Sequence, residues 1–160
     1  MLLGYDTTSA TLLHVIYFLT QHPEWQEKLY QEVYKMKDNL DYDNLKKMPI
    51  LNGIINETLR LCPPLLEFHR VAKEDCTLLD TGIKIPKGTS IAIRPQAIHF
   101  DPEYFDEPAV FNPERQHESN IAFMPFGVGN RLCVGMRFAQ VSPPSLRMQM
   151  LCFINVCSTE

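Results

Sequence analysis

The ten residues Phe126-Gly127-Val128-Gly129-Asn130-Arg131-Leu132-Cys133-Val134-Gly135 decide how this sequence is interpreted. They place one cysteine in a glycine-rich loop, directly before a helix that we expect over 136–140. The glycines let the backbone turn sharply and approach the sulfur closely. Free N–H groups and the positive end of a helix dipole favour a thiolate at such a place. The pattern therefore predicts a thiolate that binds a metal, with a buried structural cysteine as the alternative.

Two neighbours of Cys133 are compatible with haem iron as the partner of this thiolate. Arg131 can pair with a haem propionate, because a guanidinium binds carboxylates through charge-assisted hydrogen bonds. Phe126 can shield the sulfur from water, which tunes a bound iron. A buried structural cysteine would not need this set of neighbours.

The loop resembles the cysteine-loop signature of the cytochrome P450 family of haem-thiolate monooxygenases. The resemblance extends from about Leu3 to Gln140, and residues 136–139 are similar to the microsomal, xenobiotic-oxidising branch. It implies insertion of one oxygen atom from O2 into a small apolar substrate by bound haem b (iron protoporphyrin IX). The cofactor-binding residues implied in the loop are Phe126, Arg131, Cys133 and Gly135, with Cys133 as the metal ligand.

The resemblance also implies partners and a place in the cell. Members of this branch take electrons from NADPH through a flavoprotein reductase. They are held at the endoplasmic reticulum membrane by an amino-terminal anchor, which we expect to be absent from this chain. We therefore expect a reductase partner, with membrane contact only through a part that precedes residue 1.

Near the start, residues 4–9 (Gly-Tyr-Asp-Thr-Thr-Ser) resemble the oxygen-activating segment of the family's long central helix. In the family this segment delivers protons, and a hydroxyl beside an acid can hold the water chain that carries them. The resemblance assigns a catalytic role to Asp6 as the acid and to Thr7 as the hydroxyl. By itself, such a run would be interpreted as a helix cap.

Glu57-Thr58-Leu59-Arg60 resembles the family's Glu-x-x-Arg pair, and residues three apart share a helix face. Arg115 matches the family's third partner. The resemblance implies one buried, structural network of Glu57, Arg60 and Arg115 that holds the cysteine-loop side of the fold. The alternative is a solvated surface pair, worth less than about 1 kcal/mol.

Arg70 falls where this branch places a second propionate-binding arginine, so we expect it among the cofactor-binding residues. The alternative is an arginine on a surface strand. Leu65, Leu66 and Phe68 fall near the family's substrate pocket or form plain core, and the sequence leaves both interpretations open.

Composition fits one globular domain. The 160 residues are 45% hydrophobic and 21% charged, with a net charge of −4. No basic stripe appears, so we do not expect nucleic acid as a partner. The start of the chain, over residues 1–19, is too polar for a membrane span.

Cysteine and histidine spacing gives no second metal site. The odd number of cysteines and their irregular spacing fit a reducing compartment, and no pair forms the Cys-x-x-Cys motif of zinc or redox sites. His69 and His99 are not expected to bind iron, because sulfur takes one axial position and the other stays open for dioxygen. The five cysteines are Cys62, Cys76, Cys133, Cys152 and Cys157.

Hydrophobic spacing predicts helices in the first half of the chain. Residues 12–19 form a broad apolar surface. Pro23 and Pro49 each suit the first turn of a further helix, and Pro63-Pro64 stop the second of these. We expect residues 38–47 to be a polar connector with one short turn.

The middle of the chain predicts a small sheet. The strands expected are 83–85 and 91–93, joined by a hairpin turn at Lys87-Gly88, and Thr81-Gly82 is a further turn. Residues 100–113 are expected to be an ordered loop or a short helix. The fold class is therefore mainly α with a minor β-sheet (α+β), the carboxy-terminal part of the cytochrome P450 fold.

The sequence also departs from the family. Leu3 stands where the family usually has a small residue, and Gln116 replaces an expected aromatic. Pro143-Pro144 cannot continue the helix after the loop, because an interior proline costs about 3 kcal/mol or more. We expect residues 1–140 to be the haem-binding part of a cytochrome P450 domain and residues 141–160 a divergent tail.

These departures leave a second hypothesis. The chain can be a truncated product that holds haem weakly or not at all and is catalytically inactive. A zinc or redox protein that uses the scattered cysteines is a remote third.

Overall fold

A computed structural model describes residues 3–36, 47–117 and 120–141. It confirms a mainly helical fold with small antiparallel sheets. Most of the expected connector over 38–47, and the tail with Pro143-Pro144, lie outside the described residues. The elements in chain order are α1 (Leu3–Gln21), α2 (Pro23–Lys35), α4 (Pro49–Leu61), β1 (Phe68–Val71), β2 (Cys76–Leu78), the 3-10 turn η1 (Leu79–Thr81), β3 (Ile83–Ile85), β4 (Ser90–Ile93), α5 (Pro95–His99), the 3-10 turn η2 (Gly129–Arg131) and α6 (Met136–Val141).

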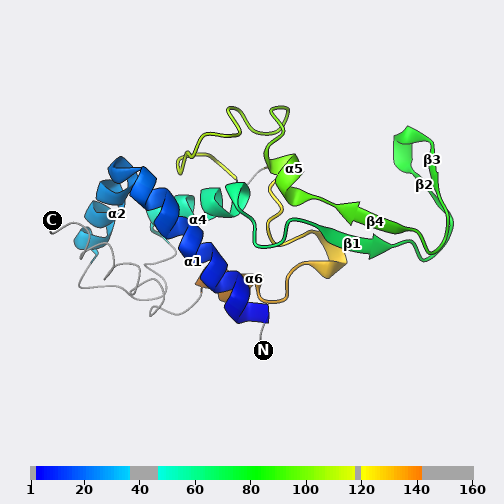
Figure 1. Cartoon of the computed structure of the whole chain (residues 1–160), viewed down its shortest axis with the longest axis horizontal. Helices are drawn as coiled ribbons and strands as arrows, with labels where there is room; N and C mark the ends of the chain where they lie inside the picture. Colours follow the sequence, from blue (N-terminus) through cyan, green and yellow to red (C-terminus); the bar gives the residue numbers. More distant parts are fainter. Residues whose placement is uncertain (1–2, 37–46, 118–119, 142–160) are drawn as a thin grey trace.

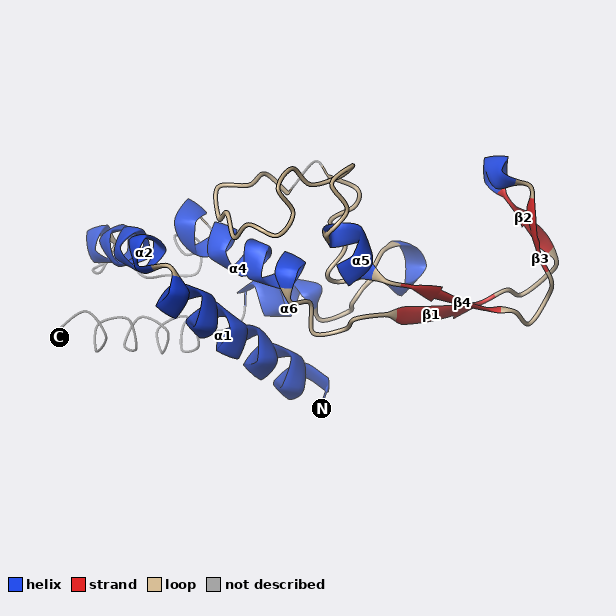
Figure 2. Ribbon diagram, turned by 45° about the horizontal axis from the view of Figure 1, so that its top comes forward, coloured by secondary structure: helices blue, strands red, loops and turns tan. Residues whose placement is uncertain are grey.

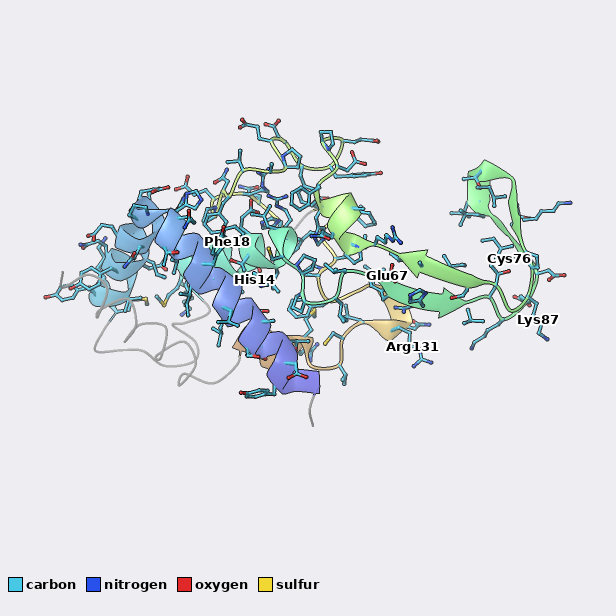
Figure 3. The ribbon with its side chains drawn as sticks, in the orientation of Figure 1. His14, Phe18, Glu67, Cys76, Lys87 and Arg131 are labelled. Atoms are coloured by element: carbon cyan, nitrogen blue, oxygen red, sulfur yellow. The ribbon has the colours of Figure 1, made fainter. Side chains whose placement is uncertain are left out.

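Three helices enclose the core. Helix α1 crosses α4, and α2 lies at one end of both (Figure 1). Phe18 reaches from α1 and stacks on Phe111, with ring centroids 4.7 Å apart (Figure 3). Burial of such side chains drives the packing, at about 1.5–3 kcal/mol for a large aliphatic or aromatic one. The buried cluster consists of Val15, Leu19, Trp25, Leu29, Met48, Leu51, Ile54, Leu61 and Phe111.

Prolines set the helix boundaries where the sequence predicts them. Pro23 and Pro49 are the first residues of α2 and α4. Their missing N–H group costs nothing there, because first-turn N–H groups have no helical partner. Helix α4 ends at Leu61, since Cys62 precedes Pro63 and a residue before proline avoids helical angles.

The predicted pairing of the two middle strands is wrong. β3 pairs with β2, and β4 pairs with β1. A turn does form at Lys87-Gly88, where the N–H of Thr89 donates to the carbonyl of Pro86. It interrupts one long hairpin whose tip is the turn ending at Gly82, because Pro86 cannot donate to a ladder. The hairpin therefore consists of two short sheets in line, and it extends away from the helices (Figure 2).

The region between β4 and the cysteine loop is largely irregular. Helix α5 is an element that the hydrophobic spacing did not predict. Residues 100–113 form an ordered loop with several turns, which is one of the two expected outcomes. This loop lies against α4, and a side chain at Gly53 would collide with the carbonyl of Pro113. Glycine therefore allows the loop to pack directly on the helix.

Candidate functional site

The cysteine loop closes on itself through its backbone. Gly127 and Gly129 adopt φ angles of 76° and 69°, a left-handed conformation that glycine adopts without strain. The N–H of Leu132 donates to the carbonyl of Gly129 over 3.0 Å, which closes η2. The N–H of Cys133 donates to the carbonyl of Phe126 over 2.9 Å. The two ends of the loop are thereby joined at Cys133.

The thiol of Cys133 is free and exposed. A side chain at Gly135 would begin 3.8 Å from the sulfur, in ordinary contact distance. Helix α6 follows directly, with the N–H of Ala139 donating to the carbonyl of Gly135 over 2.7 Å. An exposed thiol does not match the alternative of a buried structural cysteine.

The surroundings of Cys133 suit a flat apolar group that carries acidic substituents. Val128, Leu132 and Val134 all expose their side chains, and Val134 is fully exposed. Arg131 is exposed and has no hydrogen-bond or ion-pair partner within 3–36, 47–117 and 120–141. Figure 3 places Arg131 beside β1. A thiol, a cation without a partner and exposed aliphatic side chains together fit haem.

Arg70 lies on β1, on the strand face that it shares with Phe68 and with Ile91 of β4. It is half-buried, and its guanidinium carbon lies 4.9 Å from the centre of the Phe68 ring. One guanidinium nitrogen donates to the carbonyl of His69. Leu65 is exposed in the segment before this strand, as is Leu66, so neither is core in this structure.

Asp6 and Thr7 lie in the first turns of α1. Asp6 is exposed and Thr7 is half-buried. The Thr11 hydroxyl donates to the carbonyl of Thr7, and the Thr8 hydroxyl to the carbonyl of Gly4, over 2.8 Å and 2.6 Å. Figures 1 and 2 place the amino-terminal half of α1 near α6, the helix that follows Cys133.

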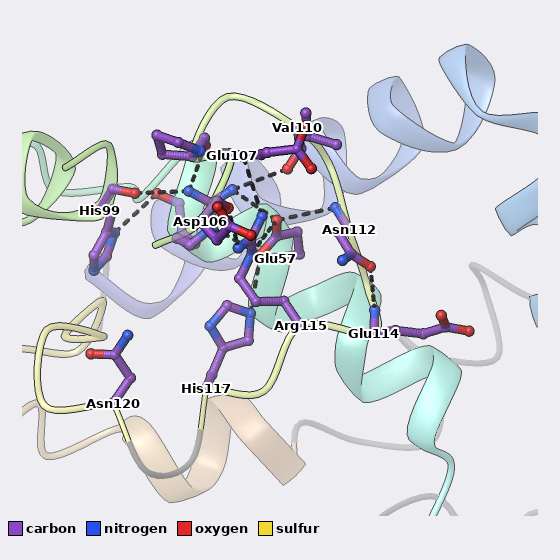
Figure 4. Close-up of polar contacts among 12 residues, drawn as sticks. Glu57, His99, Asp106, Glu107, Val110, Asn112, Glu114, Arg115, His117 and Asn120 are labelled. Atoms are coloured by element: carbon purple, nitrogen blue, oxygen red, sulfur yellow. Dashed lines mark hydrogen bonds and ion pairs between the residues drawn. The ribbon is translucent and has the colours of Figure 1, made fainter. Parts of the chain in front are cut away.

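The structure brings Glu57, Arg60 and Arg115 together in one network (Figure 4). Glu57 and Arg60 are fully buried and form a bidentate pair of 2.7 Å and 2.9 Å. The Nε atom of Arg115 lies 3.2 Å from the same carboxylate. The backbone N–H of Asn112 donates to it as well. One carboxylate thus holds a helix and the loop over 100–115 together.

The network keeps the Glu57 carboxylate charged. Burial by itself would raise the pKa of Glu57, but hydrogen bonds from Arg60, the contact with His117, the charge of Arg60 and the Asn112 N–H outweigh it. The pKa falls from 4.5 to about 2. A buried carboxylate stays charged only while such partners are in place.

Two buried histidines belong to this region and were not predicted. The Nε2 atom of His117 lies 3.1 Å from Oε2 of Glu57, in ion-pair range, although the two groups are not aligned for a hydrogen bond. His99 lies between the carbonyl of Arg60 and the N–H of Met124. His99 lies at the end of the short helix α5, and His117 lies in an irregular segment. Neither position has a hydrophobic periodicity from which burial of the histidine could be predicted.

A model of the family described as Cytochrome P450 matches residues 1–151 of the chain. The chain belongs to the cytochrome P450 family. Cytochrome P450 3A31 of Mesocricetus auratus and cytochrome P450 3A41 of Mus musculus are each 41% identical to it over 145 residues. Cytochrome P450 3A9 of Rattus norvegicus is 43% identical over 145 residues. The family expected from the cysteine loop and the branch expected from residues 136–139 are thereby confirmed.

The matches cover most of this chain but only a small part of each relative. They include 85% of this chain but 28% of each of these three relatives. The chain therefore spans about 28% of the length of the curated relatives it matches. Over the described parts of this cytochrome P450 segment, no helix is long and apolar enough to cross a membrane. Among those same residues, no group of three or more His, Cys, Asp or Glu gathers as a metal site.

Proposed function

We propose that this chain forms the cysteine-loop side of a haem-thiolate monooxygenase that inserts one oxygen atom from O2 into a small apolar substrate. The observation that carries the proposal is the exposed thiol of Cys133, held in a closed glycine loop beside Arg131 and exposed aliphatic side chains. Bound haem b would supply the oxygen-activating chemistry, since a thiolate ligand favours O–O cleavage.

The residues that would hold the cofactor come from the loop and from β1. Cys133 would be the metal ligand, with Phe126 and Gly135 packed beside it. Arg131 would pair with one propionate, and the absence of a partner for it among the described residues supports this role. Arg70 would pair with the other, and its stacking on Phe68 keeps the guanidinium on one face of β1.

Asp6 and Thr7 would hold the water chain that supplies protons. Changing Thr7 to Ala should divert reducing equivalents to peroxide while haem content stays normal. Thr8→Val is the matched control, because it removes the neighbouring hydroxyl, which donates to the carbonyl of Gly4, and leaves Thr7 in place. Unchanged coupling of electron use to product in Thr7→Ala would refute the role.

The proposed partners follow from membership of the family. Electrons would come from NADPH through a flavoprotein reductase, at the endoplasmic reticulum membrane. NADPH-dependent reduction of the haem protein by that reductase, in membranes, tests this part. Reduction only by a soluble ferredoxin would contradict it.

The decisive experiment uses a full-length chimaera, in which this chain replaces the matching segment of cytochrome P450 3A9. Cys133→Ser should abolish the thiolate-type Soret band of the reduced carbon-monoxide complex. Cys76→Ser is the control, because Cys76 is an exposed cysteine at the far end of the hairpin (Figure 3). If the band survives in Cys133→Ser, the assignment of the ligand is wrong.

One observation favours a second candidate for the 160-residue chain studied by itself. Helix α1 exposes large apolar side chains, including Tyr5 at 74%, Leu13 at 66% and Tyr17 at 58%. Apolar surface of this kind is normally covered in a folded domain. By itself the chain would then be an inactive product with weak or no haem binding.

A further inference from the structure

His99 is a fully buried polar side chain between the end of α4 and the segment that leads to the cysteine loop. Its Nδ1 atom lies 3.0 Å from the carbonyl oxygen of Arg60. Its Nε2 atom lies 3.1 Å from the backbone nitrogen of Met124. Its own carbonyl accepts a hydrogen bond of 2.8 Å from the Arg60 guanidinium. His99 therefore contacts both α4, through Arg60, and the segment that leads to the cysteine loop, through Met124.

The partners fix the tautomer of the ring. A backbone N–H can only donate, so Nε2 of His99 must accept from Met124. The ring proton is then on Nδ1, where it donates to the carbonyl of Arg60. Burial lowers the pKa of His99 from 6.5 to about 4, which keeps this neutral form at neutral pH.

Aromatic packing holds the ring in this position. The Phe123 ring contacts both buried histidines, with its centroid 5.7 Å from that of His99 and 4.3 Å from that of His117. Phe105 meets the His99 ring edge-on at 5.8 Å. The ring has little freedom to turn, so its two hydrogen bonds are directional constraints on the backbone.

Backbone hydrogen bonds continue from Met124 to the cysteine. The carbonyl of Met124 accepts from the N–H of Gly127 over 3.0 Å, which starts the loop. The carbonyl of Phe126 accepts from the N–H of Cys133 over 2.9 Å, which closes it. The position of Met124 relative to α4 therefore determines where the loop begins.

We propose that His99 is a positioning residue that fixes the Cys133 loop on α4 through its hydrogen bond to Met124. The inference rests on the proposed function, because the place of the loop matters for activity only if Cys133 is the iron ligand. A purely space-filling role is the alternative, and an apolar ring would then serve as well as imidazole.

The test compares three substitutions of His99 in the full-length chimaera. Asparagine puts an amide nitrogen near the place of Nδ1 and so keeps the bond to Arg60, but it has no acceptor at the place of Nε2. Glutamine can bring its oxygen to that place and so keeps the bond to Met124. Phenylalanine keeps the ring stacking and loses both bonds.

Two readouts are measured for each variant. The first is the fraction of haem that shows the thiolate-type Soret band in the reduced carbon-monoxide complex. The second is amide hydrogen exchange at Met124 and Cys133, with Leu29 in α2 as the remote control. Loss of the acceptor should raise exchange at both loop sites by about tenfold, because an unsatisfied buried donor is costly.

We expect His99→Asn and His99→Phe to lose thiolate-ligated haem and to exchange faster at the loop, while His99→Gln stays close to wild type. The proposal would be overturned if His99→Asn and His99→Gln had equal haem fractions and equal exchange rates at Met124 and Cys133. It would also be overturned if His99→Phe matched wild type in both readouts. A wild-type chimaera without any thiolate band would instead refute the proposed function. The exchange data would still decide the role of His99 in that case.

Discussion

At the scale of single residues, the most constrained group in this chain is the Glu57 carboxylate. It is fully buried, pairs with two arginines, accepts a hydrogen bond from a backbone N–H and lies close to His117. A buried charge is tolerated only when its partners are present. The Glu57 side chain therefore acts as a structural anchor that holds the loop over 100–115 on α4.

Removing this anchor should be strongly destabilising. Glu57→Ala leaves two guanidinium groups without their carboxylate, which should lower the free energy of unfolding by about 3–5 kcal/mol. Glu114→Ala is the matched control, because that carboxylate pairs with Lys28 at the surface and should cost less than about 1 kcal/mol. Urea unfolding of the chimaera measures both, and equal midpoints would contradict the role of Glu57.

His99 and Glu57 should give the fold two separate acid transitions. The pKa of His99 is lowered, so the unfolded chain takes up its proton first as the pH falls. The contribution of the neutral His99 ring to the free energy of unfolding is complete above pH 6.5 and is lost between pH 6.5 and about 4. The contribution of Glu57 is complete above pH 4.5 and is lost between pH 4.5 and about 2.

A comparison at two pH values tests this order. The penalty of His99→Asn in the free energy of unfolding should be smaller at pH 5 than at pH 7 by about 2 kcal/mol, since one pKa unit corresponds to about 1.4 kcal/mol. The penalty of Glu57→Ala should stay nearly constant over the same interval. A His99→Asn penalty independent of pH would show that the ring is not held neutral.

Sequence spacing could predict only part of this site. Glu57 and Arg60 are three residues apart on one helix, so their meeting follows from local geometry. Arg115 came from the family resemblance. His99 and His117 meet their partners through contacts between segments far apart in the chain, and no local pattern encodes such contacts.

At the scale of elements, one side chain joins two helices. The two carboxylate oxygens of Glu32, on α2, accept the backbone N–H groups of Ile50 and Leu51 over 2.9 Å each. These belong to the first turn of α4, whose N–H groups have no helical partner. Negative charge also suits the positive end of the helix. Glu32 thus caps α4 from outside and fixes it against α2.

Replacing Glu32 with Ala should lower the free energy of unfolding by about 1–2 kcal/mol, the usual cost of a lost helix cap. Glu32→Gln keeps one acceptor and should lie between Ala and wild type. Glu27→Ala is the control on the same helix, because Glu27 is exposed and its carboxylate accepts a hydrogen bond from Gln31 of that helix. Thermal unfolding compares them, and an undisturbed Glu32→Ala variant would exclude the capping role.

Element boundaries were predictable and strand pairing was not. Pro23, Pro49 and Pro63 impose their effects on adjacent backbone, so sequence alone located three helix ends. The turn at Lys87-Gly88 was also recognised. The strands on either side of this turn, β3 and β4, pair with β2 and β1 and not with each other. The sequences of such short strands carry little information about which strand each pairs with.

At the scale of the whole molecule, the described residues form one helical core and leave a large apolar surface exposed. The core lies between α1, α2 and α4, whereas Cys133 and its aliphatic neighbours face outward. Native proteins are stable by only about 5–15 kcal/mol, so uncovered apolar surface is a serious cost. The same segment within a longer chain would have that surface covered.

Expressed by itself, the 160-residue chain should therefore be insoluble or molten, without stoichiometric haem and without monooxygenase activity. Near-UV circular dichroism, haem content and analytical ultracentrifugation measure this, with the full-length chimaera as the control. A soluble monomer with one haem per chain and cooperative unfolding would show that the segment folds independently.

The interruption at Pro86 also divides the hairpin into two cooperative units. Sheet β2–β3 is held by only three residue pairs, with the tip at Gly82 beyond it. An isolated two-stranded pair is marginal in water. Because the ladder is broken, the tip can open while β1–β4 stays closed. We therefore expect the distal strands to form a foldon of low stability, which opens while the base of the hairpin keeps Arg70 in place.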